Sequence, residues 1–309
     1  MYETRGYNSA GECYFHTVEV VGPTPTSLIN LGLMMKAIFL GEVVGRAGLT
    51  SVKKGLKIEK YNHKSIPLCV ANAQGAANGF GLTRDEATFL LNSGVDVLTG
   101  ADKIFYKKDL VEFISTSAKI IRPLNMSPTA TPGKGVRYIE INDEKCAIIN
   151  IIGQQEVHMN ALSSPYVSLD WIIPKLKEQD IKQIYVFLHA EATAEKKCLF
   201  YYLDGKVTAV IGTKTRVMTA DSQVSVNGTA YITDNGRCGS AISVAGLEPE
   251  VEIKKERLGR VFYSKECFND LQMQGVIVES DENGKAISIE RVKERIELSN
   301  AENEKLNII

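Results

Sequence analysis

Short apolar runs recur along this chain with helical patterns between many of them. Eight runs rich in β-branched residues, several apolar on both faces, predict strands buried between layers: 36–40, 67–71, 95–99, 146–152, 184–188, 207–211, 229–233 and 275–279. A capping box at 83–86 predicts a helix over 87–92, and helices are also expected at 109–115 and 166–179. The alternation predicts an α/β fold, and the closer spacing of the late strands predicts a second, more antiparallel sheet.

Charge and cysteine usage limit the partners that the chain can have. The 36 basic and 37 acidic residues give a net charge of -1, so we expect neither DNA nor a membrane as a partner, although a local basic groove is compatible with this balance. No run approaches the roughly 18 apolar residues that a membrane helix needs. The six cysteines contain no Cys-x-x-Cys pair, which is typical of reduced thiols in the cytoplasm.

The chain is expected to contain one large domain with an extension at each end. Residues 1–34 begin with a polar, mixed-charge stretch, include Pro23 and Pro25, and lack the pattern of a signal peptide. We interpret 1–34 as an N-terminal extension that is either poorly ordered or upstream of a natural start at Met34 or Met35. The domain proper is expected over 35–293, followed by a charged C-terminal tail over 294–309, either a solvated helix or a frayed end.

Five of the predicted strands end in small polar loops: 41–45, 72–75, 100–102, 189–191 and 212–216. The carboxyl ends of strands are where α/β folds place their chemistry. The layout suits a two-metal phosphoesterase centre, yet only one of the five loops contains a histidine, His189. Most ligands that such a centre needs are therefore absent.

Several longer motifs identify a family that shares this layout. They are FLGEVVG at 39–45, Arg122-Pro123 with TPGKG at 131–135, HAEAT at 189–193, TAD at 219–221 and GTAYITD at 228–234. From about residue 36 to 291 the chain resembles the YmdB-type metallophosphoesterases, a bacterial branch of the calcineurin-like superfamily. The resemblance implies a four-layer α/β/β/α sandwich with two mixed sheets, two bridged iron or manganese ions, and hydrolysis of phosphodiesters such as 2′,3′-cyclic nucleotides. It also implies self-association.

The first three loops depart from the family's ligand set. A metal-binding Asp of the family corresponds to Glu42, which keeps the carboxylate on a longer side chain. A bridging Glu and an Asn ligand correspond to Gln74 and Gly75. In the third loop, an Asn ligand and the His that protonates the leaving group correspond to Ala101 and Asp102.

The last two loops show what replaces the missing ligands. His189 is the one family position of eight that is unchanged, whereas two family histidines correspond to Lys214 and Arg216. A protonated Lys or Arg has no lone pair to donate to a metal. Two like charges 4 Å apart also repel by about 4 kcal/mol at an effective dielectric constant of 20. We therefore predict ion pairs of Lys214 and Arg216 with Glu42 and Asp102 in place of two metals, with no cofactor.

Each of these residues also has other interpretations. His189 could be a remaining metal ligand, a general acid or a hydrogen-bonded core residue, and we favour the last. Glu42 and Asp102 could form an acid/base pair, although we favour ion pairing with the two cations. His189, Lys214 and Arg216 could also bind a nucleotide or phosphate anion, with Gln74 in the same degenerate site.

Two hypotheses for the function follow. The first is a degenerate member of the family, without two-metal phosphodiesterase activity, retained as a binding or scaffold protein for an oligomer, an unidentified protein partner or an anion. The alternative is an active phosphodiesterase on 2′,3′-cyclic nucleotides or related phosphoesters, in which Asp102, His189 and Glu42 carry the acid/base chemistry of a remodelled site.

Overall fold

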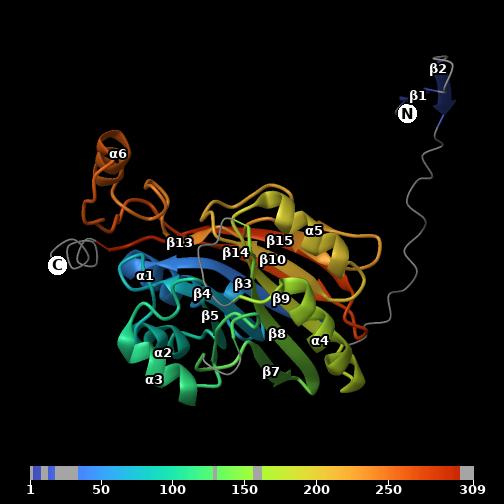
Figure 1. Ribbon diagram of the computed structural model, residues 1–309, viewed down its shortest axis with the longest axis horizontal. Coiled ribbons are helices and arrows are strands. Elements are labelled where there is room, and N and C mark those ends of the chain that lie inside the picture. Colours follow the sequence, from blue (N-terminus) through green and yellow to red (C-terminus); the bar gives the residue numbers. More distant parts are fainter. Residues whose placement is uncertain (1–2, 8–12, 18–33, 128–130, 156–161, 300–309) are drawn as a thin grey trace. The chain divides into compact units, whose positions relative to one another are not determined.

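The computed structural model describes residues 3–7, 13–17, 34–127, 131–155 and 162–299 (Figure 1). The chain divides into two compact units, Met1–Leu33 and Met34–Ile309. In the first unit, β1 (Glu3–Tyr7) and β2 (Cys13–Thr17) pair in antiparallel fashion. Residues 1–2, 8–12 and 18–33 of the predicted extension and residues 300–309 of the predicted tail lie outside the described residues. Residues 294–295 of that tail belong to the last strand instead.

The larger unit contains a seven-stranded mixed sheet in the order β15-β14-β13-β3-β4-β5-β6. Its strands are β3 (Met35–Val44), β4 (Leu68–Gly75), β5 (Val97–Thr99), β6 (Ile120–Ile121), β13 (Arg237–Ser240), β14 (Leu271–Ser280) and β15 (Ala286–Arg295). The strands β13, β3, β4, β5 and β6 run parallel, and β14 and β15 run antiparallel to their neighbours.

A second mixed sheet has six strands in the order β11-β12-β10-β9-β8-β7. They are β7 (Val136–Ile141), β8 (Glu144–Ile152), β9 (Gln183–His189), β10 (Ala209–Thr213), β11 (Gln223–Val224) and β12 (Ala230–Ile232). The central strands β8, β9, β10 and β12 are parallel, with β7 and β11 antiparallel at the two edges.

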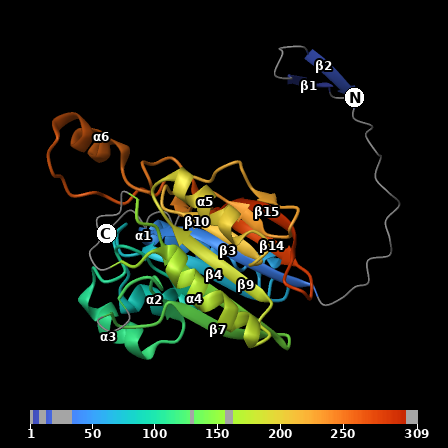
Figure 2. The same ribbon diagram turned by 45° about the vertical axis from the view of Figure 1, so that its right-hand side comes forward.

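Helices cover the outer face of each sheet. Those on the first sheet are α1 (Gly45–Gly55), α2 (Arg84–Asn92) and α3 (Lys108–Thr116), and those on the second are α4 (Pro165–Glu178) and α5 (Thr193–Leu203) (Figures 1 and 2). A short 3₁₀ turn, η1 (Glu59–Tyr61), and α6 (Pro249–Leu258) complete the elements that the structure describes. Within the described residues, the longest helix is too short and too polar to cross a membrane.

Three apolar clusters lie between these four layers. Ile38 and Leu90 belong to the cluster under α1–α3, and Leu176 and Leu199 to the cluster under α4 and α5. Phe39 belongs to the cluster between the sheets, where its ring lies 4.9 Å from that of Tyr185 and 5.7 Å from that of Phe187. Adjacent residues of β3 thus face opposite layers, as the two-residue period of a strand requires. The four-layer α/β/β/α sandwich with two mixed sheets is confirmed.

The strands predicted from the apolar runs all overlap observed strands, but one prediction about their grouping is wrong. The late strands do not form a second, antiparallel sheet. Instead β14 pairs directly with β3 along Met35–Leu40, so the end of the chain completes the first sheet. Three helices, α1, α5 and α6, were not predicted. Two of them, α1 and α5, begin immediately after the polar loops, at residues 45 and 193. The capping box at Thr83 is confirmed, since Thr83 Oγ1 accepts the Glu86 N–H at 3.3 Å.

Candidate active site at the carboxyl strand ends

The six predicted site residues lie together where the parallel strands of both sheets end. We call Glu42, Gln74, Asp102, His189, Lys214 and Arg216 the family centre. The amide nitrogen of Gln74, at the end of β4, lies 3.1 Å from Nε2 of His189, at the end of β9. This contact joins the two sheets at their carboxyl edges. Chain segments as far apart as residues 42 and 216 therefore build one centre.

Arg216 and Glu42 form a buried ion pair within the centre. Nη2 of Arg216 donates to Oε1 of Glu42 at 2.5 Å and to the Gly79 carbonyl at 2.8 Å, and Nη1 donates to the Ala245 carbonyl at 3.1 Å. Burial raises the pKa of Glu42, but the charge and hydrogen bond of Arg216 outweigh this effect, so the pKa lies below its usual value. Both terminal nitrogens of the guanidinium are thus engaged by acceptors of the chain itself.

Gly75 makes room for this ion pair. A Cβ atom at position 75 would lie 2.6 Å from Oε1 of Glu42, 3.0 Å from Nη2 of Arg216 and 2.9 Å from the Val43 carbonyl oxygen. Any side chain there would collide with the carboxylate and crowd the guanidinium. The absence of a side chain at 75 and the presence of Arg216 are therefore two parts of one arrangement.

His189 is a buried and fully hydrogen-bonded ring. Its Nδ1 lies 2.9 Å from Oγ1 of Thr213, and its Nε2 faces the amide nitrogen of Gln74. Because Oε1 of Gln74 already accepts the Ala101 N–H at 3.0 Å, the amide presents its NH2 group to the ring. Burial lowers the pKa of His189 despite the nearby Asp102 carboxylate. The ring is therefore held by partners at both nitrogens, with Asp102 as a second neighbour of Nε2.

Asp102 lies between His189 and a second cation. Its Oδ1 is 3.1 Å from Nε2 of His189 but is buried without a hydrogen-bond donor among the described residues. Its Oδ2 accepts from Nζ of Lys214 at 3.4 Å, and the same ammonium lies 3.7 Å from Glu191. Burial raises the pKa of Asp102, but the adjacent ring and ammonium outweigh burial and hold that pKa well below its usual value. The second predicted ion pair is therefore present, and it is more open to solvent than the first.

Residues that the sequence did not single out support the centre. Lys103 follows Asp102 directly, and burial lowers its pKa, with Arg216 and Lys214 contributing in the same direction. Lys196 and Asp234 are fully buried, and their Nζ and Oδ2 atoms lie 3.6 Å apart. The Asp234 carboxylate also accepts the Thr215 N–H at 2.8 Å, so it fixes the loop that carries Lys214 and Arg216. Lys103 could have been found from the sequence, because it directly follows the third loop. Lys196 could not, because no residue spacing in its helix marks it as part of a site.

The side chains at the family centre do not fit two bridged divalent ions. Such a site needs a charged bridging ligand and several imidazoles or carboxylates. Gln74 is neutral, and Arg216 occupies the carboxylate of Glu42. Among the residues that the structure describes, no group of three or more His, Cys, Asp or Glu side chains could hold a metal ion. The buried Oδ1 of Asp102, beside His189, is the atom of the centre that is left to accept a further cation or proton.

Comparison with known proteins assigns the chain to a family. A family model described as YmdB-like protein matches residues 38–292. The chain belongs to the YmdB-like family. A YmdB-like relative from Bacillus subtilis, named 2′,3′-cyclic-nucleotide 2′-phosphodiesterase, is 34% identical over 259 residues, which cover 84% of this chain and 96% of the relative.

Solved structures agree with this assignment to the YmdB-like family. A structure from Mycoplasma pneumoniae, described as a novel phosphatase, is 31% identical with a TM-score of 0.79, covering 86% of this chain and 95% of that one. A hypothetical protein from Thermus thermophilus is 30% identical with a TM-score of 0.78, covering 85% of this chain and 100% of that one. Similarity at this coverage extends over the whole sandwich.

Family membership corrects one expectation. The prediction that this chain has no cofactor is wrong, because the YmdB-like family and its named phosphodiesterase relative are metal-dependent phosphoesterases. The prediction rested only on the residue types at the family centre. Those residues bear on whether two bridged ions fit there, and not on metal use by the protein as a whole.

Proposed function

We propose that this protein is a YmdB-like homologue that does not hydrolyse phosphodiesters by the two-metal route and that acts as a binding or scaffold protein. The observation that supports this proposal most directly is the buried pair of Arg216 and Glu42, 2.5 Å apart, in the space left by Gly75. A guanidinium cannot ligate a metal, and here it neutralises the one carboxylate kept from the first ligand loop. Breaking such a buried pair is costly, so the arrangement resists opening by a substrate.

Hydrolysis assays test this proposal. The protein is incubated with 2′,3′-cyclic AMP and with bis-p-nitrophenyl phosphate in the presence of manganese or iron, beside the Bacillus subtilis relative as a positive control. We expect turnover by the relative and none above background by this protein. Turnover by this protein that His189→Ala and Glu42→Ala both abolish would contradict the proposal.

A second candidate is an active phosphodiesterase with a remodelled site. It is favoured by the contact between Asp102 Oδ1 and His189 Nε2, 3.1 Å apart, since a carboxylate–imidazole pair is a common acid/base device. The 34% identity to a protein named as a phosphodiesterase supports it as well. Under this candidate, Asp102→Asn removes turnover and leaves the fold intact. The same assays decide between the two candidates.

We also propose that the binding role includes self-association through the region around α6. No residue of α6 is buried, and after it Val261 and Tyr263 are 100% and 97% exposed. The first turn of α6 is acidic and its last turn is basic, so two copies packed antiparallel would place opposite charges together. We expect sedimentation velocity to detect an oligomer that Val261→Ser with Tyr263→Ser disrupts. If the parent protein sediments as a monomer, the proposal of self-association is wrong.

A reducing compartment such as the cytoplasm suits the thiols of this protein, and we propose that location. Cys69, Cys146, Cys238 and Cys267 are buried free thiols. Burial raises the pKa of the Cys238 thiol to about 12, which leaves it unreactive at neutral pH. Fractionation of the producing cells checks the proposal.

A further inference from the structure

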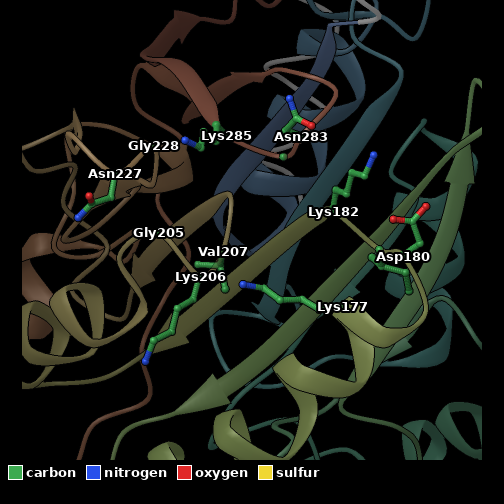
Figure 3. Close-up of a pocket in the computed structure, with 12 residues that line it drawn as sticks. Lys177, Asp180, Lys182, Gly205, Lys206, Val207, Asn227, Gly228, Asn283 and Lys285 are labelled. Carbon is green, nitrogen blue, oxygen red and sulfur yellow. The ribbon is translucent and has the colours of Figure 1, made fainter.

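A second concentration of positive charge lies at the opposite ends of β9 and β10. Four lysines line a cavity of about 260 Å³ there, together with Asp180 and Asn283. Lys177 comes from the last turn of α4, Lys182 precedes β9, Lys206 precedes β10, and Lys285 precedes β15 (Figure 3). We call it the lysine cavity. It is separated from the family centre by the full length of β9, roughly 20 Å at the usual rise per residue.

The turns that form the lysine cavity are held together by close contacts. Gly284 has a φ of 76°, and a Cβ there would lie 2.1 Å from the Lys182 carbonyl oxygen. Gly228 has a φ of 87°, and a Cβ there would lie 2.9 Å from Cβ of Lys285. Only glycine permits these approaches in left-handed conformations. The backbone N–H of Ala286 also donates to the Gly228 carbonyl at 2.8 Å, so the lysines stand on a fixed frame.

The lysines of the cavity lack acidic partners among the described residues. Lys177, Lys182 and Lys285 form no ion pair with any residue in the described part of the chain, and Lys206 lies over the Tyr202 ring at 3.8 Å. Asp281, in the same turn as Asn283 and Lys285, accepts their backbone N–H groups at 2.9 and 2.8 Å. Asp180 is the one acidic residue in the lining. The cavity is therefore a local excess of positive charge on a chain whose net charge is -1.

Size and chemistry limit what such a cavity can bind. Its 260 Å³ lies below the roughly 300–1,000 Å³ of sites for drug-sized ligands, so a whole nucleotide would extend into solvent. Its side chains offer ammonium groups and the Asn283 amide, which donate hydrogen bonds to oxygen anions, and Lys177 extends across the cavity toward Val207 (Figure 3). A ligand with several negative charges would be attracted by the lysines that surround the cavity.

We propose that the lysine cavity is a binding site for a small, multiply charged phosphate compound, of which inorganic pyrophosphate is the simplest probe. The site lies apart from the family centre and does not depend on the function proposed for it. Isothermal titration calorimetry of the full chain with pyrophosphate tests the proposal. We expect saturable binding that weakens steeply between about 50 and 300 mM salt, because screening shortens the reach of the lysine charges. Orthophosphate, with less charge, should bind at least about fivefold more weakly.

Matched variants show whether the binding is in the cavity. Lys177→Gln with Lys182→Gln should weaken pyrophosphate binding at least about tenfold, as expected for the loss of hydrogen bonds to charged groups. Lys293→Gln removes the same charge from an exposed position on β15 outside the cavity, and it should change the affinity less than about twofold. All these variants should unfold at nearly the parent temperature, because the lysines are exposed.

Several results would overturn the proposal. They are an absence of saturable heat at 50 mM salt, equal weakening by the Lys293 control, and loss of binding in Lys214→Gln but not in the cavity variant. Binding of a single-stranded oligoribonucleotide without binding of pyrophosphate would also overturn it, since that result would indicate an extended nucleic-acid surface. These outcomes concern the lysine cavity alone, and the hydrolysis assays test the function of the family centre separately.

Discussion

The two ends of β9 and β10 carry similar charges in opposite arrangements. At the carboxyl ends, Arg216 and Lys214 are paired with Glu42 and Asp102, and the Arg216 pair is buried. At the amino ends, the cations of the lysine cavity are exposed and unpaired within the described chain. The comparison separates two uses of basic residues: paired and buried, they hold loops together, whereas exposed and unpaired, they are available to a ligand.

Removing Arg216 is the strongest test of this comparison. Arg216→Ala leaves the Glu42 carboxylate buried without its partner, so we expect a loss of about 3–5 kcal/mol in the free energy of unfolding. Urea denaturation monitored by circular dichroism measures it. The double variant Glu42→Leu with Arg216→Met should recover most of the loss, because a buried ion pair can be replaced by apolar groups at little cost. A loss below about 1 kcal/mol in Arg216→Ala would mean that solvent reaches Glu42.

A side chain at position 75 tests the packing around the same pair. Gly75→Ala should destabilise the protein by about 1–3 kcal/mol, because its Cβ meets the Glu42 carboxylate and the Val43 carbonyl. Combined with Arg216→Ala, the losses should sum to less than the two single values, since both changes disturb one contact. Strict additivity in the same denaturation assay would show that position 75 and Arg216 act independently.

Acidic pH should weaken the centre through His189. Burial places the folded-state pKa of His189 below its ordinary value near 6.5. The stability that depends on the neutral ring is therefore complete above the ordinary value. It is lost as the pH falls toward the folded-state pKa. We expect the free energy of unfolding to fall with a slope of at most about 1.4 kcal/mol per pH unit between pH 6.5 and 5. His189→Gln should flatten this slope. An unaltered slope in His189→Gln would exclude the histidine as its source.

Removing a cavity lysine should have the smallest effect on stability. Lys182→Gln is expected to change the free energy of unfolding by no more than about 0.5 kcal/mol, as is usual for exposed positions. Any change should be toward greater stability at low salt, because one repelling charge is gone. Urea denaturation at about 20 and 500 mM salt measures both the change in the free energy of unfolding and its dependence on salt. A large destabilisation would indicate that Lys182 is a structural residue like Arg216.

Much of the fold could be predicted because its strands are apolar on both faces. The run at 146–152 and the run at 184–188 are buried between layers in β8 and β9. Their short length and their content of β-branched and aromatic residues favoured strands over buried helices. The sheet to which the late strands belong could not be predicted in this way. The pairing of β14 with β3 joins residues more than 230 positions apart, and local patterns contain no information about such a partner.

The candidate site was predicted residue by residue from the family motifs, and its six members do lie together. The pairing of Arg216 with Glu42 rather than Asp102 depends on the loop after β10, where Lys214 and Arg216 both have positive φ values. Spacing alone does not determine which way such side chains turn. The lysine cavity was not predicted at all, because its residues come from four turns that are adjacent only in the folded chain.

The contact at Gly75 has a consequence for any redesign of the family centre. A side chain at position 75 would meet the Glu42 carboxylate and crowd Arg216. Removing Arg216 alone would leave Glu42 buried and charged. Either single change passes through a less stable protein, so positions 75 and 216 would have to be exchanged together.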